Sequence, residues 1–316
     1  DSPVSIGAGA RYYEGLALLE LGRAREAEQM LLKSLSLEPN ALQPEMKLRE
    51  LYMLQLRRDA FRSLLRARRP FHRWGPADLL DFLVVGNIPS SLLGNWSEKI
   101  EKFAQNDPED TQSRLALAQY YAAWGKHVEC AEIARSRLRR DATDTKARAL
   151  LADSLLNLDN IAEAAATLKQ FPAEECKDAW VWRSMGRLAL SELDFARAAE
   201  CFRVSLHFAP GDPSATYQLG MALEKINDDK RATELIQLGR ELNRLMDTAQ
   251  RIMQRVADGS DAKGIHEEVL ALGELMLECN ANEDSMYCFE LVVHDDPSNQ
   301  EVRKLYARAK SNFTKS

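Results

Sequence analysis

Small residues return at a fixed interval of 34 positions in this sequence. One column of Gly and Ala runs through Ala118, Ala152, Gly186 and Gly220, with Gly15 and Gly273 as members nearer the two ends. A second column follows twelve residues later in each copy, as Ala27, Cys130, Ala164, Ala198, Ala232 and Ser285. A period of this length is typical of stacked supersecondary units, none of which can bury its apolar face alone. The spacing therefore predicts an extended array of repeats.

The two columns have a mechanical meaning if each copy is a pair of helices. Small residues on both helices let the two backbones approach closely, and large apolar side chains fill the space that remains. Four residues after the second column the sequence supplies such side chains, namely Leu31, Leu168, Phe202, Ile236 and Phe289. Proline disfavours helix at the preceding residue and ends the second helix. It stands near the end of several copies, as Pro39, Pro108, Pro210 and Pro297.

The copy at 179–212 resembles the tetratricopeptide repeat. Its residues follow the signature W-x₂-L-G-x₂-Y…A-x₃-F…P as Trp182, Met185, Gly186, Ala189, Ala198, Phe202 and Pro210. The resemblance is strong at 8–41, 111–144, 145–178, 179–212, 213–246 and 266–299, and degenerate at 42–76 and 77–110. Residues 300–316 are expected to form a capping helix. The resemblance implies an all-α fold, an α-solenoid of about eight hairpins wound as a right-handed superhelix.

We predict four segments along the chain. They are N-terminal hairpins at 1–110, a central array of four repeats at 111–246, a helix extension and turn at 247–265, and a C-terminal repeat with the capping helix at 266–316. From Asp229 to Ala257 apolar residues recur at steps of three and four, which predicts a helix of roughly 40 Å, about twice the usual length. This helix either packs along the hairpin at 266–299 or protrudes and mediates self-association.

Composition and motifs argue against several function classes. The net charge of −6 makes nucleic acid an unlikely partner, and no apolar run has the length of a membrane span. No spacing supports a catalytic residue, a metal site or a cofactor, so we expect no enzyme. Five scattered cysteines without a C-x-x-C pair are interpreted as reduced thiols packed between helices. They favour a reducing, cytoplasmic compartment, while an exported protein whose signal has been removed stays a second interpretation.

The resemblance implies a binding site for a segment of another protein. In the family the first helix of each repeat lines the concave face. Transferred position by position, the peptide-contact residues are Gln119, Lys146, Asp153, Asn157, Trp180, Arg183, Arg187, Tyr217, Gln218 and Met221. An exposed tryptophan beside two arginines is typical of an interaction hot spot. The function expected is a non-catalytic scaffold or adaptor, an assembly subunit that holds a peptide or helix of its partner.

A second candidate surface lies in the first degenerate copy. Its arginines recur at helical spacing and would form a basic patch of Arg58, Arg62, Arg66, Arg69 and Arg73. They could bind an anionic ligand or nucleic acid through guanidinium forks. Alternatively they form a solvated face paired with acids such as Glu45, Glu50 or Asp78. A third interpretation is that the chain is the helical module of a larger multidomain protein.

Overall fold

The structure is a computed structural model. It describes residues 3–70, 78, 81–82, 93–169, 176–257 and 265–315, and within these ranges the regular elements are all helices. They are α1 (Pro3–Glu20), α2 (Ala24–Leu37), α3 (Leu42–Leu54), α4 (Arg58–Arg68), α6 (Leu93–Asn106), α7 (Thr111–Ala123), α8 (His127–Arg140), α9 (Thr145–Asn157), α10 (Ile161–Lys169), α11 (Ala179–Ser191), α12 (Phe195–Phe208), α13 (Pro213–Lys225), α14 (Asp229–Ala257), α15 (Ile265–Glu278), α16 (Asn282–Asp295) and α17 (Gln300–Phe313).

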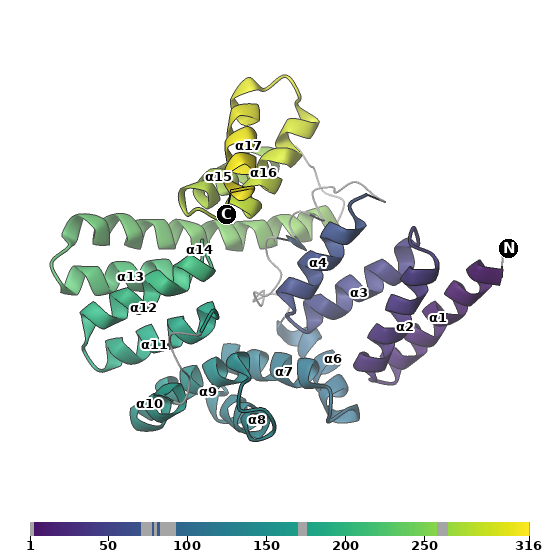
Figure 1. Cartoon of the computed structure of the whole chain (residues 1–316), viewed down its shortest axis with the longest axis horizontal. Helices are drawn as coiled ribbons and strands as arrows, with labels where there is room; N and C mark the ends of the chain where they lie inside the picture. The colour runs from purple at the N-terminus through teal and green to yellow at the C-terminus, as the bar shows by residue number, and fades with distance from the viewer. Residues whose placement is uncertain are drawn as a thin grey trace. The chain divides into compact units, whose positions relative to one another are not determined.

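Successive helices pair as hairpins, which confirms the predicted all-α solenoid class. The pairs are α1 with α2, α3 with α4, α7 with α8, α9 with α10, α11 with α12, α13 with α14, and α15 with α16, while α17 covers α16. The helices divide into two compact units (Figure 1). Unit 1 comprises residues 1–73 and 85–140, and unit 2 comprises 74–84 and 141–316. The four segments drawn from the sequence stay a prediction.

The degenerate copies differ from each other. Residues 42–76 contain the hairpin of α3 and α4, although Arg49 occupies the small-residue position and its guanidinium lies 5.8 Å from the centre of the Phe61 ring. In the copy at 77–110, much of the first half lies outside the described residues. Its second half is α6, whose Ile100 and Phe103 join the core of unit 1. Phe82, assigned to unit 2, is fully buried and lies edge-on to Tyr287 of α16 at 5.0 Å.

The small-residue columns are the contact lines of the hairpins. A Cβ atom built on Gly186 would lie 2.6 Å from Cε1 of Phe202, and one on Gly220 would lie 2.8 Å from Cγ1 of Ile236. Real Cβ atoms essentially never approach a neighbour so closely, so only glycine fits these positions with the neighbour in place. The apolar residues predicted to fill the hairpins are thus the ones that contact the glycines.

The turn inside each hairpin depends on a left-handed residue at position 15 of its 34-residue copy. Its φ lies between 52° at Leu56 and 76° at Gly22. The full column is Gly22, Leu56, Gly125, Asp159, Leu193, Asn227 and Asn280. The amide of the following residue closes the first helix, as Asp194 does by donating to the Ala189 carbonyl at 2.9 Å. This is the Schellman arrangement that favours glycine or asparagine.

Leu193 is the exposed one of the two leucines in this column, and its backbone strain can be relieved by substitution. It is 72% exposed at φ 62°, a backbone region that costs an L-residue with a Cβ about 1–2 kcal/mol. Glycine at this position would remove the strain, but part of the stability gained is lost because glycine has more conformational freedom in the unfolded chain. Leu193→Gly is therefore expected to raise the free energy of unfolding by about 0.5–1 kcal/mol in urea titrations. Ser191→Gly, two residues earlier in α11, serves as the control and should lower it; a loss of stability in Leu193→Gly would contradict the assignment.

Three junctions between consecutive repeats contain a side-chain hydrogen bond that we term the inter-repeat staple. A donor at position 4 of one copy binds the backbone carbonyl at position 32 of the copy before it. Arg114 Nη1 donates to Pro108 at 3.3 Å, Arg148 Nη2 donates to Ala142, and Trp182 Nε1 donates to Cys176 at 2.8 Å. Trp182 is therefore a hydrogen-bond donor as well as the packing residue that the signature indicates.

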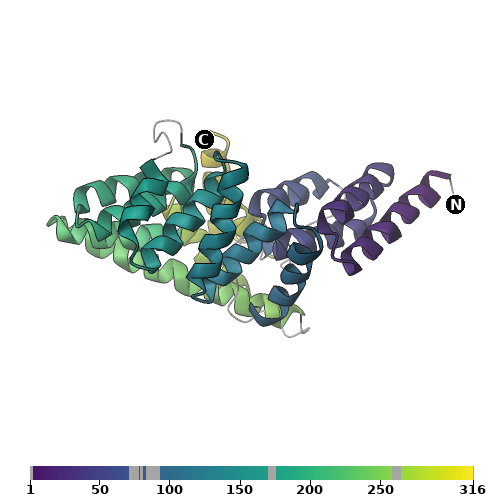
Figure 2. The same cartoon turned by 90° about the horizontal axis from the view of Figure 1, so that it is seen from below.

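The long helix is present with the predicted bounds. α14 has 29 residues, pairs with α13 and continues past its end to contact α15 (Figure 1 and Figure 2). This contact favours packing along the next hairpin, and self-association through α14 stays a prediction. No helix within the described ranges is both long enough and apolar enough to cross a bilayer.

The five cysteines are free thiols, as predicted. All but Cys279 are buried, and burial raises the pKa of Cys201 and of Cys279 to about 11. Such thiols are largely protonated at neutral pH and are poor nucleophiles.

Candidate peptide-binding face

All the predicted peptide-contact residues except Gln119 lie on the first helices of three successive repeats in unit 2. Lys146, Asp153 and Asn157 lie on α9, Trp180, Arg183 and Arg187 on α11, and Tyr217, Gln218 and Met221 on α13. α9 packs directly against α11, and α13 packs on α12 of the same hairpin as α11. We call this set the α9–α11–α13 face.

The N-terminal end of α11 is fixed by Asp178, the residue that caps it. One carboxylate oxygen accepts a hydrogen bond from the Trp180 amide at 2.8 Å, and the other accepts one from Thr145 Oγ1 of α9 at 2.6 Å. The cap therefore satisfies a free backbone N–H of α11 and ties the start of that helix to the neighbouring repeat. The backbone at Trp180 is therefore held in place by the cap.

Two cations lie close to the Trp180 ring. The Lys146 ammonium is 5.9 Å and the Arg183 guanidinium 5.3 Å from the ring centre, within the range of cation–π attraction. The sequence predicted an exposed tryptophan, but the ring is only half exposed because it also packs against the core around Val181 and Met185. The smaller part of the side chain that stays exposed is open to a ligand.

Arg183 is held by the cap of the next helix. Its Nη1 lies 2.9 Å from Oδ2 of Asp212, whose Oδ1 accepts the Ala215 amide at 3.0 Å at the start of α13. Burial lowers the pKa of Arg183, but the carboxylates of Asp212, Asp153 and Asp178 more than offset this, so that the pKa lies above its ordinary value. Arg183 is a permanent cation that links α11 to α13.

Arg187 links α11 to the preceding repeat, through α9. Its Nη1 lies 2.9 Å from Oδ1 of Asp153 on α9, and both side chains are about three-quarters buried. Asn157 is exposed and donates to the Asp153 backbone carbonyl at 2.7 Å. Both arginines that were expected to meet a ligand are thus already paired with aspartates of adjacent repeats. A ligand carboxylate would compete with these partners.

The three residues from α13 differ in how far they belong to the face. The backbone of Tyr217 packs against Gly239 of α14, where an added Cβ would lie 2.8 Å from the Tyr217 nitrogen, and Arg240 of α14 lies 5.8 Å from the Tyr217 ring. Tyr217 therefore belongs partly to the α13–α14 hairpin. Gln218 and Met221 are half-buried, and Gln218 Oε1 accepts no hydrogen bond from the described residues.

Gln119 belongs to α7, in unit 1. It is 7% exposed, and its Nε2 donates to the Leu115 carbonyl of the same helix at 3.3 Å. Its amide is consequently directed into its own helix, and little of it is accessible to a partner.

The predicted basic patch does not form a uniform face on α4. Arg58 and Arg66 are exposed and Arg69 is half-buried, but Arg62 is only 7% exposed, and Arg73 lies outside the described residues. Two neighbouring arginines are in ion pairs across helices: Arg57 with Glu28 at 2.6 Å and Arg68 with Glu45 at 2.8 Å. The second pair involves one of the acids that the sequence had suggested. The patch itself stays a prediction.

Comparisons with known proteins found a family model and solved structures that are similar to parts or most of this chain. The family model of anaphase-promoting complex, cyclosome, subunit 3 matches residues 96–171. A solved chain of the APC/C hetero-tetramer Cut9–Hcn1 is 14% identical, over 91% of this chain and 54% of that one, with a TM-score of 0.49. A tetratricopeptide repeat protein from Parabacteroides merdae is 11% identical, over 96% of this chain and 99% of that one, with a TM-score of 0.40.

This chain spans about half the length of the matched APC/C chain. No curated protein matches it. The chain is an all-α solenoid of the tetratricopeptide-repeat type, built from helical hairpins whose small-residue columns lie at the helix contacts.

Proposed function

We propose that this protein is a non-catalytic scaffold or adaptor whose α9–α11–α13 face binds an extended segment or a helix of a partner protein. The observation that carries the proposal is the half-buried Trp180 ring with the cations of Lys146 and Arg183 close to it. Tryptophan and arginine are enriched among the residues that contribute most to binding at protein interfaces.

The ion pairs around Trp180 support this role because they fix the face before binding. Arg183 is tied to Asp212 and Arg187 to Asp153, so the aromatic ring and the helices on either side are already ordered. A pre-ordered surface loses less conformational entropy on association than a flexible one. We expect the partner to place an apolar side chain on Trp180 and an acidic one near Lys146.

The match of residues 96–171 to a family of complex subunits supports an assembly role without indicating a partner. Repeat arrays present extended surfaces for such contacts, and the fold alone leaves the process open.

Trp180→Ala is expected to weaken binding of the physiological partner at least tenfold, measured by titration calorimetry with the purified partner. Trp124→Ala is a matched control, since Trp124 is also half-buried with a lysine ammonium, that of Lys126, 5.3 Å from its ring, but lies in unit 1. Equal weakening in both variants, or none in Trp180→Ala with an unchanged circular dichroism spectrum, would remove the proposal.

Charge reversal at Arg183 or Arg187 is a less specific test. A glutamate there would stand beside Asp212 or Asp153 and weaken the contact between repeats, so loss of binding would not distinguish recognition from folding.

A further inference from the structure

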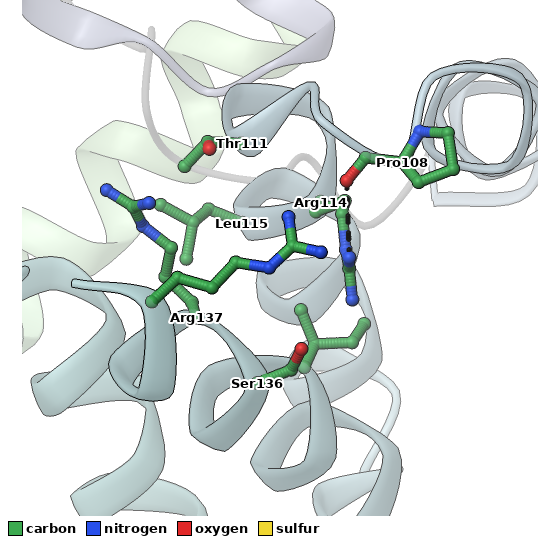
Figure 3. A pocket seen from close by; sticks show the side chains of 8 residues that line it. Pro108, Thr111, Arg114, Leu115, Ser136 and Arg137 are labelled. Atoms are coloured by element: carbon green, nitrogen blue, oxygen red, sulfur yellow. Dashed lines mark hydrogen bonds between the residues drawn. The ribbon is translucent and has the colours of Figure 1, made fainter.

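A pocket of about 280 Å³ lies in unit 1, open to solvent and formed by the hairpin of α7 and α8 with the turn before it. The residues that line it are Pro108, Thr111, Arg114, Leu115, Ile133, Ser136, Arg137 and Arg140. Three are arginines, two carry hydroxyl groups, three are apolar, and none is acidic. Figure 3 shows Arg114, Arg137, Thr111 and Ser136 around this pocket.

Two of the arginines keep donor capacity. Arg114 donates one N–H to the Pro108 carbonyl at 3.3 Å in the inter-repeat staple, and a guanidinium carries five such donors. Arg140 pairs with Glu109 at 2.9 Å, with 51% and 64% of the two side chains exposed. An ion pair so open to water contributes little and exchanges readily.

The next repeat shows what is particular about this pocket. Arg148 stands 34 residues after Arg114, yet it is 3% exposed, and it donates to the carbonyls of Ala142 and, at 2.7 Å, of Thr167. Thr167 lies among the last four residues of α10, whose carbonyls have no partner within the helix. The corresponding residue of the earlier repeat, Ile133, lies well inside α8, where its carbonyl is already bonded. Arg114 therefore lacks the second acceptor that closes the site around Arg148.

We propose that this pocket binds a phosphate monoester on a segment of a partner protein. Guanidinium groups bind phosphate oxygens bidentately, and the Thr111 and Ser136 hydroxyls supply further donors. The lining holds three cations and no carboxylate, with Glu109 paired to Arg140 just outside it, and this suits a group of charge −1.5 to −2 better than a carboxylate of charge −1. The pocket is open to solvent, which suits a single side-chain group on a partner segment.

The test uses the full chain with ¹⁵N-labelled arginine, following the side-chain Nε–Hε resonances by NMR. The probes are N-acetyl-phosphoserine methylamide, N-acetyl-glutamate methylamide and inorganic phosphate. We expect the phosphoserine probe to bind about tenfold more tightly than the glutamate probe. Its affinity should fall below about pH 6, where the phosphate takes up a proton.

Arg114→Gln and Arg140→Gln, each folded by circular dichroism, should weaken the phosphoserine probe about tenfold or more. Arg197→Gln is the matched control, because Arg197 is a half-exposed arginine on α12 of unit 2, 3.6 Å from Glu192. It should leave the affinity unchanged.

Several outcomes would overturn the proposal. Equal affinity for the phosphoserine and glutamate probes would make the site a carboxylate site. Tighter binding of inorganic phosphate than of phosphoserine would make free phosphate the ligand. Equal weakening by Arg197→Gln would mean non-specific charge attraction.

Discussion

Replacing Arg68 with methionine should lower the free energy of unfolding of unit 1 by about 3–5 kcal/mol. The Glu45 carboxylate is fully buried, and Arg68, itself 7% exposed at its side chain, reaches it at 2.8 Å and also donates to the Pro39 carbonyl. Methionine fills a similar volume but leaves the charged Glu45 carboxylate in the core without the Arg68 guanidinium. Arg49 lies 4.0 Å from Glu45 and compensates part of the lost ion pair. We therefore expect the free energy of unfolding to fall by an amount nearer 3 than 5 kcal/mol, that is, about 3 kcal/mol.

Urea titration with far-ultraviolet circular dichroism measures this change. Arg58→Met on the same helix is the control, since Arg58 is exposed and its loss should cost about 0.5 kcal/mol or less. Adding Glu45→Leu to Arg68→Met should recover much of the stability, because an apolar pair replaces the charge pair. If Arg68→Met and Arg58→Met were equally mild, the buried pair would not support the fold as described.

Gly186→Val is expected to destabilise unit 2 by about 3 kcal/mol. The new Cβ would lie 2.6–2.8 Å from three atoms of the Phe202 ring, and that ring is fully buried. Gly9→Val is the matched control: Gly9 is also helical, but nothing lies within 4 Å of its Cβ position, so its stability should change by less than about 1 kcal/mol.

A double substitution identifies the cause. Phe202→Leu alone leaves a cavity and lowers stability, but combined with Gly186→Val it should cost less than the sum of the two single changes. Strict additivity would show that the glycine matters for a reason other than its contact with Phe202.

The sequence was sufficient for the fold because close packing leaves its mark at single positions. A small residue such as Gly186 or Ala198 indicates a helix contact even when the facing residue is not known. The recurrence of such residues every 34 positions indicates the same contact in each repeat. The left-handed turn position was not visible in this way. Gly125, Asp159, Leu193 and Asn227 share a backbone conformation but have no side-chain chemistry in common.

The candidate sites were less predictable because they depend on pairs of residues in different repeats. The sequence indicated that Arg183 and Arg187 stand one turn apart, but their partners Asp212 and Asp153 come from the helices on either side. Arg62 fits the helical spacing of a basic face and is nevertheless buried. Likewise, the pocket at Arg114 depends on α8 extending further along its repeat than α10 does, a difference that the repeat signature does not encode.

The inter-repeat staple has a consequence for engineering by module exchange. Trp182 donates to the carbonyl of Cys176, and Arg148 donates to that of Ala142. A block cut at the start of a signature, 145–178 or 179–212, therefore contains the donating side chain but not the carbonyl that accepts its hydrogen bond. Grafts cut a few residues earlier, at 142–175 or 176–209, carry both groups together. Chimaeras joined at the earlier boundary should therefore fold more readily than those joined where the consensus begins.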